Sequence, residues 1–165
     1  MAMADAHPRY DMEMSVTWGD CDAAGISYYA RTFDWFTNAR MGLLAHYGLP
    51  YMKEWHQRDI ALVCLHADCR YKKMIRPEER IVVRAELAEL SRSRMAFTYL
   101  VLQEDGVVAA EGQTKHAYVD GRGAPFNLER RQPELWARLA EAGLIQRGKY
   151  PGTANRQTGV EDAHG

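Results

Sequence analysis

The chain has 165 residues, of which 47% are hydrophobic and 26% are charged, and its formal net charge is −1. This length fits a single domain, and the apolar fraction is large enough for a core. A nearly neutral chain has no overall attraction for nucleic acid or for an anionic membrane, so we expect neither as a partner. Any site for an anion must therefore be local.

The cysteines and the start of the chain bear on localisation. Cys21, Cys64 and Cys69 are odd in number and lack paired spacing, which predicts reduced thiols and a cytoplasmic protein. Each is more simply interpreted as a small buried hydrophobe than as a redox residue. The first eight residues have no basic segment followed by an apolar run, so no signal peptide is predicted, and no apolar run approaches transmembrane length.

The first predicted element is a half-buried strand from Met12 to Trp18, because apolar and polar residues alternate there. Its apolar face would hold Met12, Met14, Val16 and Trp18. A loop over residues 19–27 follows, and it carries two carboxylates, Asp20 and Asp22.

A long helix is predicted from about Tyr28 to about Tyr47, with Gly48 as its left-handed cap. Its wide apolar arc predicts a mostly enveloped helix, and the arc consists of Tyr29, Phe33, Phe36, Leu43, Leu44 and Tyr47. Arg40 points into this arc, so we expect it to form an internal ion pair with a carboxylate.

Residues 51–59 are a linker that is either irregular or a short helix. From Ile60 the period changes to two, which predicts a run of antiparallel strands. Each strand is expected to have one apolar face. These faces hold Ala61, Val63, Leu65, Ala67, Cys69 and Tyr71 in the first of these strands, Ile81, Val83, Ala85 and Leu87 in the second, and Met95, Phe97, Tyr99 and Val101 in the third. A last strand is predicted over residues 107–120. One buried helix plus these strands predicts an α+β fold.

The domain plan is one domain over residues 1–148, with a core over about 12–128 and an extra helix over about 132–145. Pro133 suits the first position of that helix. Residues 149–165 are rich in Gly, Thr, Asn and Gln, which predicts a flexible tail.

Asp20 and Asp22 allow three interpretations. They could bind Mg²⁺, but nothing nearby completes such a site, and we predict no metal. They could be helix caps, which composition alone favours. They could also place a carboxylate base or nucleophile beside the unpaired N–H groups of a helix start, which acyl transfer requires.

The stretch Asp20-Cys21-Asp22-Ala23-Ala24-Gly25-Ile26, followed by Tyr28-Tyr29 and a long helix, resembles the hotdog-fold acyl-CoA thioesterases of the 4-hydroxybenzoyl-CoA thioesterase group. The resemblance covers about residues 12–128. It implies a curved antiparallel sheet wrapped around one long central helix.

In that group Asp22 matches the catalytic carboxylate, and Asp20 matches a structural one. The resemblance implies that Asp22 attacks the thioester carbonyl or activates water against it. The backbone N–H of Tyr29 would polarise the carbonyl oxygen, and Gly25 would let the backbone turn close to the substrate. CoA is part of the substrate, so no cofactor is expected.

The acyl group is not fixed by the sequence. In the namesake enzyme a helix carboxylate addresses the ring hydroxyl of the substrate, and the matching position here is Thr37. The aromatic residues of the helix fit an aromatic or a short or medium acyl group, but they fit core packing equally well. No Gly-x-Ser-x-Gly motif is present, and the histidines have no triad or metal-ligand spacing.

The phosphates of CoA need a local cationic patch. The turn Ser91-Arg92-Ser93-Arg94 lies where the family has a basic cluster, so Arg92, then Arg94, with Ser91, are the expected contacts. A second basic group, comprising Arg70, Lys72, Lys73 and Arg76, is interpreted as a solvated face.

Two other functions remain open, namely a thioesterase for acyl carrier protein and a non-catalytic acyl-CoA binding module. The first would need a cationic surface for an acidic carrier, and the presence of Asp22 argues against the second. Open sheet edges and the family resemblance predict a homo-oligomer, a dimer at least, with a tetramer expected as a dimer of dimers.

Overall fold

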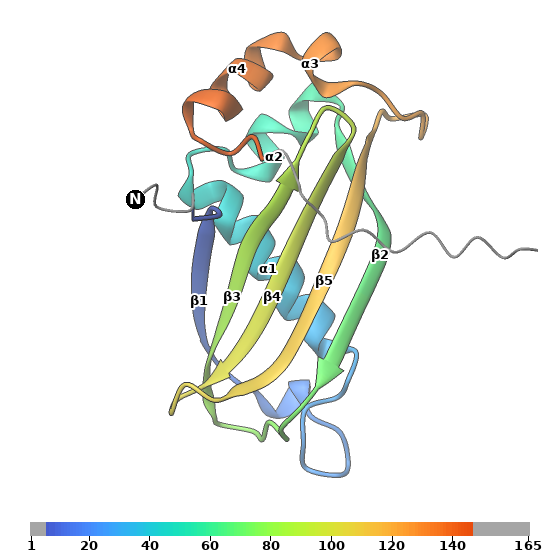
Figure 1. Ribbon diagram of the computed structural model, residues 1–165. Helices are drawn as coiled ribbons and strands as arrows, with labels where there is room; N and C mark the ends of the chain where they lie inside the picture. The colour runs from blue at the N-terminus through green and yellow to red at the C-terminus, as the bar shows by residue number, and fades with distance from the viewer. Residues whose placement is uncertain (1–5, 147–165) are drawn as a thin grey trace, which may run out of the picture.

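A computed structural model of the chain, which describes residues 6–146, contains one five-stranded antiparallel sheet in the order β1-β3-β4-β5-β2. One long helix lies behind this curved sheet (Figure 1). The α+β hotdog prediction is confirmed. The strand bounds are β1 Arg9–Ser15, β2 Ala61–Tyr71, β3 Arg80–Leu90, β4 Arg94–Gln103 and β5 Val108–Val119.

Helix α1, Arg31–His46, connects the two edge strands by crossing behind the sheet. Phe36 anchors it: its ring stacks on the buried Tyr99 of β4 with centroids 4.2 Å apart and planes 7° apart. Gly48, at φ +80°, ends the helix as predicted, because the N–H of Leu49 then reaches the carbonyl of Leu44 at 2.9 Å.

Two predicted boundaries around the loop before α1 are wrong. The first strand ends at Ser15, and Trp18 opens a 3₁₀ turn, η1 Trp18–Asp20, with 68% of its surface exposed. The helix begins at Arg31 rather than Tyr28, because the N–H of Tyr28 donates to the carbonyl of Asp20 at 2.8 Å. Hydrogen bonds of the loop therefore fix the conformation of Trp18 and Tyr28, which the sequence pattern had assigned to a strand and a helix.

The predicted single face of the second strand is also wrong. A β-bulge interrupts the pairing of β2 with β5 between Cys64 and His66. Opposed residues share a face, so Leu62, opposite the buried Tyr118, faces the helix, whereas Val63 faces outward. Beyond the bulge the predicted set Ala67, Cys69 and Tyr71 does face the helix. Leu65, in the bulge, is 55% exposed.

Short helices cover the end of the sheet at which α1 ends (Figure 1). The 51–59 linker contains α2 Tyr51–Glu54 and a 3₁₀ turn, η2 His56–Arg58. The expected extra helix is two elements, α3 Leu128–Arg131 and α4 Pro133–Glu141, and Pro133 takes the predicted first position. The predicted tail over 149–165 lies outside the described residues.

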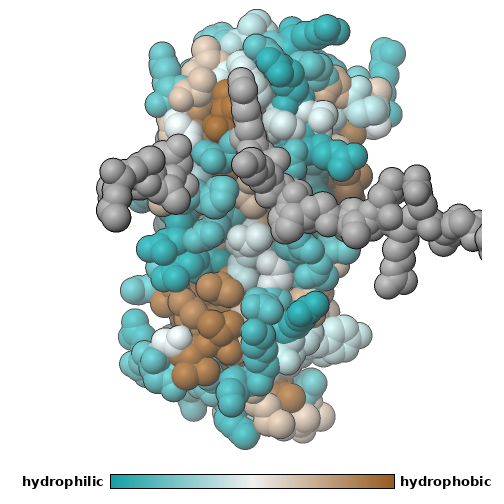
Figure 2. Space-filling model, in the orientation of Figure 1, coloured by the Kyte–Doolittle hydropathy of each residue, from teal (hydrophilic) through white to brown (hydrophobic). Residues whose placement is uncertain are grey.

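The face of the sheet opposite α1 is mostly polar, with one apolar patch at the ends of β3 and β4 near their connections to β2 and β5 (Figure 2). Half-buried Val82, Leu100 and Leu102 point to this face. Among the described residues, no helix is long and apolar enough to cross a membrane.

Candidate functional site

Asp22 lies on a tight loop between η1 and α1 and is exposed. One carboxylate oxygen, Oδ1, accepts from the N–H of Ala24 at 2.8 Å, and the backbone closes around it through a bond from the N–H of Asp22 to the carbonyl of Ile26 at 3.0 Å. Gly25, at φ +73°, has open space where a side chain would be. In the described part of the chain, one oxygen of Asp22 is thus hydrogen-bonded and the other is not.

Asp20 has a different role, in agreement with its structural interpretation. Its Oδ2 accepts from the backbone N–H of Thr17 at 2.9 Å and from the Thr17 hydroxyl at 2.8 Å. These bonds cap η1 and fix where the loop begins. They also occupy this carboxylate, whereas Asp22 remains available.

The N–H of Tyr29 lies beside the Asp22 loop, because Tyr28 is bonded to Asp20. In residues 6–146 this N–H has no hydrogen-bond acceptor. Tyr71 of β2 holds the same peptide segment, since its hydroxyl donates to the carbonyl of Tyr29. Partial burial raises the pKa of Tyr71 to about 12, so the hydroxyl stays a donor at neutral pH. The loop therefore presents an unpaired donor next to a carboxylate, as acyl transfer needs.

Arg40 lies in the core as predicted, at 9% exposure, but the expected carboxylate partner is wrong. It forms no ion pair with an acid of the described residues. Its Nη1 donates to the hydroxyl of Tyr99 at 3.1 Å, and its Nη2 donates to that of Thr37 at 3.4 Å. Its Nε is buried with no acceptor. A charge has been buried against hydroxyls rather than against an anion.

Thr37 is the exposed end of this group, on the side of α1 that faces solvent. Its hydroxyl donates to the carbonyl of Phe33 at 3.0 Å while accepting from Arg40. Thr37, the predicted specificity position, is thus hydrogen-bonded to Arg40, which was expected to form an ion pair with a carboxylate.

The polar group continues onto β5 with Thr114 and His116, for which no functional role was predicted from the sequence. The hydroxyl of Thr114 lies 2.6 Å from that of Tyr99 and 2.9 Å from Nε2 of His116, whose Nδ1 is buried without a partner. Burial, and then the charge of Arg40, lower the pKa of His116 to about 4, so its ring is neutral. Polar residues at alternate positions on the buried face of the last strand were the available signal.

Ser91 and Arg92 lie in the turn between β3 and β4, and Arg94 is the first residue of β4, at the other end of the sheet from Asp22 (Figure 1). The Asp22 loop is bonded to the connection between β2 and β3, since the N–H of Ser27 donates to the carbonyl of Ile75 at 2.7 Å. The intervening strand spans about 35 Å. One protomer therefore does not bring the predicted phosphate contacts together with Asp22.

Within that turn the three residues differ in availability. The backbone N–H of Arg94 donates to the Ser91 hydroxyl at 3.2 Å, so the Ser91 side chain closes the turn. Arg92 pairs with Glu129 of α3, and its guanidinium lies 6.0 Å from the Trp136 ring of α4. The C-terminal helices thus hold Arg92 at the surface, and Arg94 is exposed.

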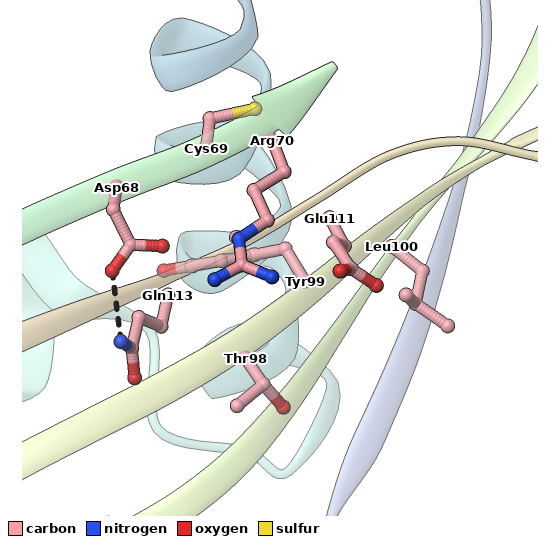
Figure 3. A pocket seen from close by; sticks show the side chains of 9 residues that line it. Asp68, Cys69, Arg70, Thr98, Tyr99, Leu100, Glu111 and Gln113 are labelled. Atoms are coloured by element: carbon pink, nitrogen blue, oxygen red, sulfur yellow. Dashed lines mark hydrogen bonds between the residues drawn. The ribbon is translucent and has the colours of Figure 1, made fainter. Parts of the chain in front are cut away.

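A hollow of about 630 Å³ lies on the opposite face of the sheet from α1. Figure 3 shows Arg70 over it, between Asp68 and Glu111, and a hydrogen bond of 2.8 Å from Gln113 to Asp68. It contains none of the predicted site residues, and its lining has two acids, Asp68 and Glu111, for one base, Arg70, so it does not form a cationic site.

Comparison with known proteins gives a consistent picture. A family model described as the thioesterase-like superfamily matches residues 16–142. A protein of Aquifex aeolicus, named a putative esterase, is 38% identical to this chain over 106 residues. The match covers 63% of this chain and 80% of that protein. A 1,4-dihydroxy-2-naphthoyl-CoA hydrolase of Thermosynechococcus vestitus is 28% identical over 109 residues, covering 66% and 75%.

Solved structures agree on the fold. A DHNA-CoA thioesterase from Staphylococcus aureus superimposes with a TM-score of 0.76 at 22% identity, covering 82% of this chain and 91% of that one.

Proposed function

The chain belongs to the thioesterase-like superfamily, and from that premise we propose that it hydrolyses acyl-CoA thioesters at the Asp22 loop. The observation that carries the proposal is the pairing of an exposed carboxylate, that of Asp22, with the unpaired N–H of Tyr29 on the adjacent segment.

The chemistry follows from these two groups. The side chain of Asp22 is exposed, and in the described residues only its Oδ1 is hydrogen-bonded. Its free oxygen attacks the thioester carbonyl carbon, or takes a proton from water that does so. The N–H of Tyr29 stabilises the oxyanion, and the C–S bond breaks as the CoA thiolate leaves. On the nucleophilic route, water then hydrolyses the mixed anhydride on Asp22, which releases the acid and restores the carboxylate. Loss of one such donor typically costs about 10²–10³ in rate.

An aromatic acyl group is the first substrate class to test. The relative from T. vestitus is named for an aromatic acyl-CoA. In this chain, Phe33 and Thr37 lie one helical turn apart on α1, which begins two residues after Tyr29, so a ring leaving the carbonyl site would lie along them. We assign Thr37 to the acyl group on this basis.

The active unit in this proposal is a homodimer formed through β2. Both β1 and β2 are edge strands, but β2 is longer and carries the exposed Val63 and Leu65. Such an edge is a template for another strand. Two-fold antiparallel pairing of β2 with its copy reverses one protomer, so the turn bearing Arg92 and Arg94 approaches the partner's Asp22 end. CoA would then span two chains.

A tetramer needs a second surface. The apolar patch of Val82, Leu100 and Leu102 supplies one, and we propose that two dimers meet there. The three cysteines are free, which supports the proposal of a cytoplasmic protein.

A panel of acyl-CoA esters with a thiol-detecting dye tests the proposal. It should include benzoyl, hydroxybenzoyl, 1,4-dihydroxy-2-naphthoyl and straight-chain acyl groups. We expect turnover of at least one member, with free CoA and the acid as products in equal amounts. Absence of thiol release above the buffer rate across the panel would refute the proposal.

A further inference from the structure

The buried polar group formed by Arg40, Tyr99, Thr114 and His116 has more donors than acceptors. Arginine cannot accept a hydrogen bond, so the hydroxyl of Tyr99, which accepts from Arg40, can donate only to Thr114. When every hydroxyl proton is assigned an acceptor, the Thr114 hydroxyl donates to Nε2 of His116. A neutral ring protonated at Nδ1 follows, and that N–H is buried without an acceptor.

Two N–H groups are thus left over at the two ends of this chain of bonds, Nε of Arg40 and Nδ1 of His116. The group also has one full positive charge and no acid. A buried unpaired cation is strongly unfavourable, and each unmet donor adds to the cost. An anionic oxygen from outside the described chain would balance the charge of Arg40 and accept from its Nε.

The outer end of the group lies at the surface of α1. Its outer member is Thr37, which is exposed and bonded to Arg40, whereas α1 packs chiefly on β1 and β3 and leaves β2 largely uncovered. Phe33 and Thr37 lead from the helix start to Arg40. The axial rise from Arg31 to Thr37 is about 9 Å, a length that a medium acyl chain or a fused aromatic ring can span.

The geometry points to Arg40 as the residue that selects the acyl group: it binds a carboxylate or an acidic phenol at the end of the acyl group farthest from the thioester. This inference rests on the proposed function, because it takes the carbonyl of the substrate to lie at Asp22 and Tyr29. Tyr99 is a positioning residue, since its hydroxyl and its stacking on Phe36 hold the guanidinium.

The test compares acyl-CoA esters that differ only at the distal end. Hexanedioyl-, octanedioyl- and decanedioyl-CoA carry a free carboxylate, and hexanoyl-, octanoyl- and decanoyl-CoA are their neutral counterparts. We expect the wild-type kcat/KM to favour one carboxylated ester by about 10- to 100-fold, the range of a charge-assisted bond. Arg40→Met should remove this preference, and Arg40→Lys should retain part of it.

The matched control is Arg84→Gln, which removes an arginine from the outward face of β3, where it pairs with Asp11 at 2.8 Å. It should leave the preference unchanged. Equal preference in the wild type and Arg40→Met would overturn the inference, and so would a preference for the neutral esters in the wild type.

Thermal melting separates recognition from structural support. If the charge of Arg40 is balanced only when a ligand is bound, Arg40→Met removes an uncompensated charge from the free protein. This variant should then melt at the same temperature as the wild type or higher. A lower melting point together with dissociation of the dimer would assign Arg40 to a carboxylate of the partner and overturn the inference.

Binding distinguishes this inference from the proposed function. The probes are two non-hydrolysable CoA thioethers, one ending in a carboxylate and one in a methyl group, with affinities measured by calorimetry. If the wild type prefers the carboxylate and Arg40→Met does not, the inference stands even if no ester is hydrolysed. If neutral esters are hydrolysed but neither assay depends on Arg40, the inference fails and the proposed function stands.

Discussion

Gly112→Ala tests the packing that positions the polar group. Gly112 of β5 lies under the α1 helix, and a Cβ there would be 2.4 Å from the carbonyl oxygen of Asp68 and 2.6 Å from Cε2 of Phe36. Ordinary contacts of this kind are 3.4–4 Å. The neighbours would therefore have to move by about 1 Å, which interiors packed like crystals resist.

Neither neighbour can move cheaply. Asp68 contributes a backbone atom of β2, which pairs with β5, and Phe36 is fully buried against Tyr99. Overpacking typically costs about 1–3 kcal/mol, and we expect about 3 kcal/mol here because both contacts are rigid. For a domain of this size that lowers the melting temperature by about 6–12 °C.

The assay is thermal melting by circular dichroism, with urea unfolding for the free energy. Gly121→Ala is the matched control: its Cβ would be 2.7 Å from Oδ1 of Asp59, a largely exposed side chain that can rotate away. It should change stability by only about 0.5 kcal/mol. The entropy that alanine removes from the unfolded chain is shared by both variants. A Gly112→Ala protein melting within about 2 °C of wild type would refute this packing.

Three further predictions follow from the structure. Arg92→Ala should raise KM for CoA esters more than it lowers kcat, with no effect on a pantetheine thioester, because the phosphates bind alike in ground and transition states; an equal loss with both substrates would exclude a phosphate contact. Asp20→Asn should lower the melting temperature while affecting kcat far less than a change at Asp22. Arg138 lies 2.5 Å from Glu54 and lowers the pKa of that carboxyl below its ordinary 4.5. The pair therefore stabilises the fold above that pH, and its contribution is lost as the pH falls through the lowered pKa. The melting temperature of Glu54→Gln should fall less than that of the wild type as the pH is lowered.

The sheet was largely readable from the sequence because its inward positions are consistently apolar. The sets beginning with Ile81 and Met95 are all buried, as their period of two predicts. The bulge at Leu65 was not readable, since one extra residue in a strand leaves the alternation of residue types intact while shifting the register.

The candidate site could be predicted from the sequence only where its residues are close together in the chain. Asp22, Gly25 and Tyr29 lie within eight residues of one another, and the structure brings them to one loop. The surroundings of Arg40 depend on Tyr99, 59 residues away, and no local pattern reports such a contact. A buried arginine suggests an acidic partner on general grounds, but nothing in the sequence shows that the partner is a hydroxyl.

The position of Arg92 shows a third kind of limit. Its basic turn is visible in the sequence, but its separation from Asp22 by the full length of β3 and its pairing with Glu129 follow from the topology and from the helices after β5. The proposed pairing of two copies, which would bring Arg92 to the partner's Asp22 end, has no signal in the sequence of one chain.

The most direct test of the central claim is the single-turnover rate of thioester cleavage by wild type and Asp22→Asn with the best substrate of the panel. Asparagine keeps the size of the side chain and the acceptor for the N–H of Ala24 but removes the charge. We predict an unchanged melting temperature and a rate lower by about 10²–10⁴-fold, the usual contribution of a positioned base. A rate within about twofold of wild type would show that the reaction does not use Asp22.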